Sequence, residues 1–93
     1  MKTCLKCTKK HLTRAYGLLD ESTLGYPIYR AYAYGEMSLA ESECVQLYPI
    51  LAEQIREERK KMDDNDTYQP LLEELITMVL TAIEAVNGPK LPA

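Results

Sequence analysis

The sequence predicts an all-α protein, an antiparallel bundle of four helices, from three observations. Apolar residues recur every three or four positions along most of the chain, which is the period of an amphipathic helix. Proline residues fall between these periodic stretches or at their starts, where helices end and begin. No stretch has the alternation of apolar and polar residues that is typical of a strand. The chain of 93 residues is expected to form a single helical domain, in which residues 89–93 are a short C-terminal tail. The helices are expected at about 4–24, 27–47, 49–62 and 68–86.

The first expected helix follows Thr3, a suitable N-cap, and stops near Gly25, since glycine readily adopts a left-handed backbone. Gly17 lies inside this helix at a cost of about 1 kcal/mol relative to alanine, which predicts a close helix contact there. The main apolar stripe of the helix is Leu5, Thr8, Leu12, Ala15, Tyr16 and Leu19.

The second and third expected helices meet at Tyr48-Pro49, because a residue before proline avoids the helical region. With no linker between them, they could instead form one long helix that is kinked at Pro49. Alternating spacings of four and three predict the packed seam of the second helix, made of Ala33, Met37, Ala40, Cys44, Leu47 and Leu51. The inward residues of the third helix are Leu51, Ala52, Ile55 and Met62. Its solvated face is Glu53, Arg56, Glu57, Lys60 and Lys61.

The fourth expected helix is apolar over more than half of its circumference. Asp66 or Thr67 is expected to cap it, and Asn87-Gly88-Pro89 is expected to end it. A helix this apolar is either buried centrally or shared with another subunit. We therefore expect self-association as a homodimer, or binding of another protein, through Leu72, Ile76, Val79, Leu80 and Ile83.

The candidate metal site starts from Cys4, Cys7 and His11, which share one face of the first helix. If the first two helices form an antiparallel hairpin that turns near residue 25, Cys44 lies level with Cys7. Thiolate and imidazole groups are zinc ligands, so Cys4, Cys7, His11 and Cys44 could hold a structural Zn²⁺. Glu41 or Glu43 is a less attractive fourth ligand, since both are expected to lie off the seam. The alternative is that no cofactor binds and Cys44 is a small buried apolar residue.

The same N-terminal region allows two other interpretations. A thiol-redox role would use lysines and a helix N-terminus to lower a cysteine pKa, but thioredoxin-type motifs follow a strand. A nucleic-acid-associated role would use a lysine patch that tracks phosphates, although the net charge of −3 disfavours it. These bases could instead pair with Glu41 and Glu43 of the neighbouring helix. The patch consists of Lys2, Lys6, Lys9, Lys10 and Arg14.

Composition excludes several other classes. The start of the chain has no signal-peptide pattern, and no segment is apolar enough to span a membrane. Three cysteines without an export signal argue against a disulfide framework, so a reduced cytoplasmic location is expected. A single histidine cannot supply the paired Glu-x-x-His motifs of a di-iron bundle, and there is no phosphate-binding loop or nucleophile turn. The prediction is a small non-enzymatic interaction or accessory protein.

Cys4, Cys7, Lys10, His11 and Leu12, followed by Gly25-Tyr26-Pro27, resemble a group of small proteins from phages and prophages that is functionally uncharacterised. The resemblance covers roughly the first half of the chain. It implies a phage or bacterial origin and no activity. Some members of the group carry histidines where this chain has Tyr29 and Met37, so a shared metal site is not implied.

Overall fold

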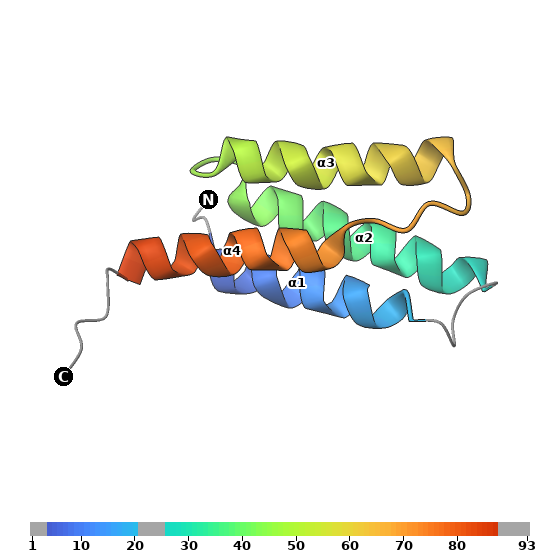
Figure 1. The fold of residues 1–93 in the computed structure, drawn as a ribbon, viewed down its shortest axis with the longest axis horizontal. Helices are drawn as coiled ribbons and strands as arrows, with labels where there is room; N and C mark the ends of the chain where they lie inside the picture. Colours follow the sequence, from blue (N-terminus) through green and yellow to red (C-terminus); the bar gives the residue numbers. More distant parts are fainter. Residues whose placement is uncertain (1–3, 21–25, 88–93) are drawn as a thin grey trace.

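A computed structural model describes residues 4–20 and 26–87, which form four α-helices (Figure 1). No strand occurs within these two ranges, so the predicted all-α fold is confirmed. The predicted C-terminal tail, residues 89–93, lies outside the described residues. The helices are α1 (Leu5–Leu18), α2 (Pro27–Cys44), α3 (Pro49–Asp64) and α4 (Leu72–Asn87).

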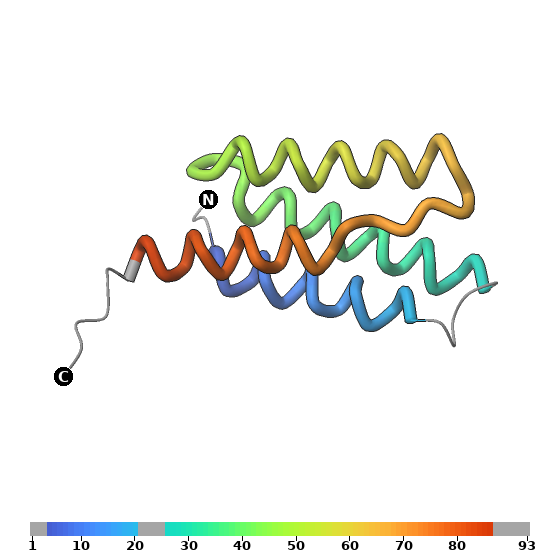
Figure 2. The backbone as a smooth tube through the Cα atoms, viewed as in Figure 1, coloured from blue at the N-terminus to red at the C-terminus, as the bar shows by residue number. Residues whose placement is uncertain are grey.

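Successive helices run in opposite directions along an elongated body of 48 × 28 × 18 Å (Figure 2). The pair α1–α2 has the most extensive contact and forms the centre of the molecule. Helix α3 packs on α2 and helix α4 packs on α1, while the contact between α3 and α4 is much smaller than these. The start of α1 therefore lies beside the end of α2, where the Cys4 amide donates to the carbonyl of Glu43.

The core follows the predicted stripes closely. In α1 the buried residues are Thr8, Leu12 and Ala15, and in α2 they are Ala33, Met37, Ala40 and Cys44. The other two helices contribute Leu51, Ala52, Ile55, Met62, Leu72, Leu75 and Val79. Small alanines on both central helices leave room for their backbones to approach. Tyr16 and Leu47 were expected in these stripes but are exposed, Leu47 because α2 already ends at Cys44.

Helix α1 ends at Leu18, earlier than expected. The Leu19 amide closes the last turn by donating to the carbonyls of Ala15 and Tyr16. A Cβ placed on Gly17 would meet nothing within 4 Å, so the predicted close helix contact at this residue is wrong. Glycine instead weakens the last turn of an exposed helix end. The expected stop at Gly25 lies outside the described residues.

The break at Pro49 separates two distinct helices that run in opposite directions rather than kinking one (Figure 2). Val45–Leu47 form a turn, and Tyr48 takes an extended φ of −130°. With a ψ of 62°, Tyr48 lies outside the helical region, which a residue before proline avoids.

Helix α4 begins at Leu72, four residues later than expected, and Asp66 and Thr67 do not cap it. The Thr67 amide and hydroxyl instead donate to the Asn65 side chain in a local turn. The connection of residues 65–71, which we call the α3–α4 connection, is held non-helical by side chains of α2 and α3. The Arg30 guanidinium donates a hydrogen bond to the Tyr68 carbonyl, and the Glu58 carboxylate accepts one from the Leu71 amide. A helix that starts at residue 68 would use the Tyr68 carbonyl for its own hydrogen bonds, and it would need a helical backbone at Gln69, which proline disfavours in the residue before it.

Within residues 4–20 and 26–87, no helix combines the length and the apolar character that crossing a membrane requires.

Candidate functional site

Two half-buried cysteines mark the N-terminal end of α1. Cys4 is the N-cap, with an extended backbone, and its Sγ accepts a hydrogen bond of 3.1 Å from the Cys7 amide. The Cys4 amide donates to the Glu43 carbonyl at 3.0 Å. Because the backbone of both helices makes these bonds, Cys4 and Cys7 are placed against the last turn of α2.

Glu43 completes this group. The Sγ atoms of Cys4 and Cys7 and a carboxylate oxygen of Glu43 all lie within 4.8 Å of one another. All three residues are half-buried, so the group is open to solvent on one side. We call this set the Cys–Cys–Glu cluster. Two thiols and a carboxylate at this separation are a chemically suitable ligand set for a metal ion.

The structure does not bring the four predicted zinc ligands together. The His11 ring Nδ1 lies 2.6 Å from a carboxylate oxygen of Glu36, one turn along α1 from the cluster. Cys44 is fully buried in the core, and its Sγ contacts the carbonyl of Glu41 at 3.6 Å. The Cys–Cys–Glu cluster therefore contains Cys4 and Cys7 but neither His11 nor Cys44, and Glu43 takes the third place.

The difference arises from the rotation of α1 about its own axis. Cys44 lies at almost the expected level, but the α1 side chain that interacts with its thiol is that of Thr8 rather than Cys7. One position along a helix turns the side chain by about 100°. Thr8 therefore faces the core, whereas Cys7 faces the edge of the α1–α2 pair where Glu43 lies.

The electrostatic surroundings of Cys7 and Cys44 do not favour the redox alternative. The hydrogen bond with Cys4 raises the pKa of Cys7, as do desolvation and the nearby charge of Glu43, and only Lys10 lowers it. Burial raises the pKa of Cys44 to about 11. A reactive cysteine needs a lowered pKa, and these directions are opposite.

A thiol titration at pH 8 is expected to find Cys4 and Cys7 reacting with Ellman's reagent at least about tenfold faster than Cys44. With a pKa of about 11, roughly one Cys44 thiol in a thousand is ionised at that pH, and the side chain is fully buried. The slow phase is expected to vanish in the Cys44→Ala variant and to become fast in denaturant. A single rate for all three thiols in the folded protein would contradict the buried position of Cys44.

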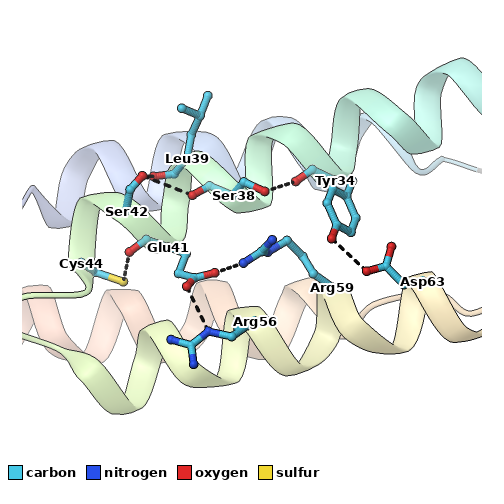
Figure 3. Close-up of polar contacts among 9 residues, drawn as sticks. All are labelled: Tyr34, Ser38, Leu39, Glu41, Ser42, Cys44, Arg56, Arg59 and Asp63. Atoms are coloured by element: carbon cyan, nitrogen blue, oxygen red, sulfur yellow. Dashed lines mark hydrogen bonds and ion pairs between the residues drawn. The ribbon is translucent and has the colours of Figure 1, made fainter.

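The lysine patch is exposed along α1. Within the part of the chain that the structure describes, no ion pair involves Lys6, Lys9, Lys10 or Arg14, and Lys2 lies outside that part. The expected pairing with Glu41 is wrong. Glu41 instead binds two arginines of α3, Arg56 at 3.1 Å and Arg59 (Figure 3).

A groove separates this patch from α4. Leu80 and Ile83 of α4 provide apolar lining beside the α1 residues, and the volume of the groove is about 570 Å³. Its α1 side is lined by Lys6, Lys9, Lys10, Thr13 and Arg14. We call this surface the basic groove.

The predicted self-association surface on α4 is largely internal. Leu72 and Val79 are buried in the core of the chain itself, so they are not exposed to a second copy. Ile76 and Ile83 are half-buried against that core. Of the five predicted residues, Leu80 is exposed, at 40%. The broad apolar character of α4 is thus explained mainly by its packing on α1.

Sequence reasoning missed a polar centre between α2, α3 and the α3–α4 connection. The Arg30 guanidinium donates to the carbonyls of Tyr68 at 2.7 Å, Asn65 at 2.8 Å and Met62 at 3.1 Å. The carboxylate of Glu58, whose side chain is 7% exposed, accepts from the Tyr68 hydroxyl, the Leu71 amide and Lys61. The signals were present in the sequence. Arg30 is the only base among residues 15–55, and Glu58 interrupts the apolar stripe of its helix.

Comparison with known proteins finds no matching family model, no matching curated protein and no matching solved structure. The fold and its surface features define a small all-α protein with a thiol–carboxylate cluster at one end and a basic groove along one side.

Proposed function

We propose that this protein is a small non-enzymatic interaction protein that binds an acidic amphipathic helix of a partner protein in the basic groove. The observation that carries the proposal is a row of exposed bases beside an apolar floor. Lys6, Lys9, Lys10 and Arg14 have no ion-pair partner among the described residues, and Leu80 lies 40% exposed next to them.

The dimensions of the groove suit a helix. Lys6 to Arg14 span about 12 Å of α1, roughly two helical turns. Leu80 and Ile83 are one turn apart on α4 and can receive apolar side chains that repeat every three or four residues. Acidic residues on the flank of such a helix would lie along the bases of α1. Helix-in-groove binding of this kind combines an apolar anchor with charge complementarity.

Nucleic acid is the weaker candidate for the same surface. The net charge of −3 opposes general attraction to a polyanion. None of the residues that line the groove is aromatic, and its floor is apolar, so it lacks the stacking platform on which single-stranded bases rest.

We further propose that the protein works in the reducing cytoplasm, since its three cysteines are free thiols.

The test uses a designed acidic helical peptide as the probe. Its length is roughly 16 residues, with leucines at helical spacing on one face and glutamates on the flanks. Titration into ¹⁵N-labelled protein is expected to shift amide resonances of α1 and α4, with a Kd of about 1–100 µM. Raising the salt from about 50 to 300 mM is expected to weaken binding several-fold, because exposed charges are screened.

Variants assign the binding to the groove. Lys6→Glu combined with Lys9→Glu is expected to weaken the peptide at least about tenfold, and Leu80→Ser several-fold. Lys60→Glu reverses one exposed lysine of α3 away from the groove and is the matched control for each single reversal, Lys6→Glu or Lys9→Glu. The proposal fails if about 1 mM peptide causes no shifts, or if a lysine-flanked version of the peptide binds equally well. It also fails if a 20-nucleotide single strand binds more tightly, or if Leu80→Ser dissociates a dimer.

A further inference from the structure

The geometry of the Cys–Cys–Glu cluster points to a metal site, which is independent of the proposed partner binding. Tetrahedral Zn²⁺ bonds thiolate sulfur at about 2.3 Å and carboxylate oxygen at about 2.0–2.2 Å, which separates neighbouring ligand atoms by roughly 3.5–4 Å. The ligand atoms of Cys4, Cys7 and Glu43 already lie within 4.8 Å of one another. Small side-chain rotations can therefore close the cluster around an ion without moving the helices.

The backbone holds the two sides of the cluster together. Cys4 is bonded through its amide to the Glu43 carbonyl, and its Sγ accepts the Cys7 amide. Glu43 lies in the last turn of α2, where no base is present and the dipole disfavours a negative charge. A divalent cation would offset the negative charge of Glu43 at this point.

We infer that Cys4, Cys7 and Glu43 bind a thiophilic divalent cation, with Zn²⁺ the best match, and that a water molecule takes the fourth position. Two thiolates select zinc over magnesium or calcium, which prefer oxygen ligands alone. Binding converts two thiols and a carboxylate into three metal bonds and releases two protons to solvent. No oxidation or reduction occurs, so the site differs from a disulfide between Cys4 and Cys7.

The consequence for the fold is a connection between the first turn of α1 and the last turn of α2. Because three ligands come from two helix ends, the ion binds the folded protein far better than the unfolded chain. Saturating Zn²⁺ is expected to raise the melting temperature by several degrees. Affinity is expected to fall by up to about 100-fold for each pH unit of acidification, since two protons compete with each ion.

The first experiment is a titration of Co²⁺ into the reduced, untagged full-length chain without oxygen. We expect thiolate-to-cobalt charge-transfer absorption in the near ultraviolet and tetrahedral ligand-field bands in the visible. Both signals should saturate at one equivalent and disappear when Zn²⁺ is added. Cys4→Ser and Cys7→Ser are each expected to weaken binding at least about 30-fold, and Glu43→Gln about tenfold.

Two further variants separate this ligand set from the alternatives. Cys44→Ala and His11→Gln are expected to retain the cobalt spectrum, because neither residue belongs to the cluster. Loss of the spectrum in either variant, with the fold intact by circular dichroism, would overturn the inference in favour of another ligand set. Absence of charge-transfer absorption would overturn it, as would binding that Glu43→Gln leaves unchanged. Peptide binding to the basic groove is measured without metal, so the two proposals can fail separately.

Discussion

Replacing Arg30 with alanine is expected to lower the free energy of unfolding by about 2–3 kcal/mol. One guanidinium satisfies three carbonyls, those of Met62, Asn65 and Tyr68, at distances of 2.7 to 3.1 Å. Met62 lies in the last turn of α3, where helix carbonyls have no partner within the helix. Without the Arg30 side chain, these carbonyls bond to water or have no hydrogen-bond partner. Urea unfolding followed by circular dichroism measures the change.

Arg30→Lys separates charge from geometry. An ammonium group is a compact charge and cannot reach three carbonyls in the planar fork of a guanidinium, so lysine is expected to restore less than half of the loss. Arg14→Ala is the matched control, because Arg14 is exposed on α1 and has no hydrogen bond or ion pair among the described residues. Its expected cost is below about 0.5 kcal/mol. Equal costs for the two alanine variants would show that Arg30 does not secure the α3–α4 connection.

The helices and the core could be predicted because they depend on local periodicity. The seam of α2 was predicted residue by residue at Ala33, Met37, Ala40 and Cys44, all fully buried. A single period of three to four apolar residues determines which face of a helix packs. The break at Pro49 was also predictable, because the steric restriction on Tyr48 is local.

The start of α4 was predicted four residues too early, although Pro70 is a local signal, because Gln69 precedes a proline and avoids the helical region. Side chains that are distant in the sequence then fix the backbone of this connection. Local signals at Asp66 and Thr67 favour an earlier helix start. The backbone of the connection is instead hydrogen-bonded by two side chains from earlier in the chain. Arg30 bonds to Tyr68, 38 residues later, and Glu58 bonds to Leu71, 13 residues later. A tertiary contact of this kind overrides a capping preference of about 1 kcal/mol.

The candidate metal site was predicted in part. Cys4 and Cys7 were found from their spacing, and the level of Cys44 was nearly correct. The identity of the third ligand depends on the rotation of α1 about its axis. An error of one residue in this rotation puts Cys7 at the core, where the structure has Thr8. Periodicity defines such a rotation only to within a residue. Glu43 was therefore judged a less attractive ligand because it lies off the seam. That position at the side of the seam is the one from which its carboxylate reaches the two thiols.

Replacing Glu58 with alanine is expected to cost about 2–4 kcal/mol at pH 7, because the carboxylate acts on the first amides of α4 from another helix. It accepts from the Leu71 amide at 2.8 Å and from the Tyr68 hydroxyl at 2.6 Å, and its side chain is 7% exposed. A negative charge at this position also interacts favourably with the dipole of α4. The bond to Lys61 adds little, since the Lys61 side chain is 53% exposed.

The pH dependence identifies the charged form as the stabilising one. Burial alone would raise the pKa of Glu58, but the hydrogen bonds from Tyr68, Leu71 and Lys61 outweigh it, and the pKa lies below its usual 4.5. A pKa that is lower in the folded state than in the unfolded state gives stability that is present above pH 4.5 and is lost as the pH falls through the folded value. The difference between the wild type and Glu58→Gln is therefore expected to be largest near pH 7 and to shrink below pH 4.5.

Unfolding curves at several pH values, for the wild type, Glu58→Gln and Glu57→Gln, measure this dependence. Glu57 is the exposed neighbour on α3, so its replacement is expected to leave both the stability and its pH dependence nearly unchanged. A gap between the wild type and Glu58→Gln that stays constant down to pH 3 would mean that shape rather than charge matters at this position. If the stability difference shrinks below pH 4.5 as expected, an ionised side chain of α3 determines where α4 starts. The placement of Leu80 and Ile83 in the basic groove then depends on the same carboxylate, because these residues follow on the helix that it caps.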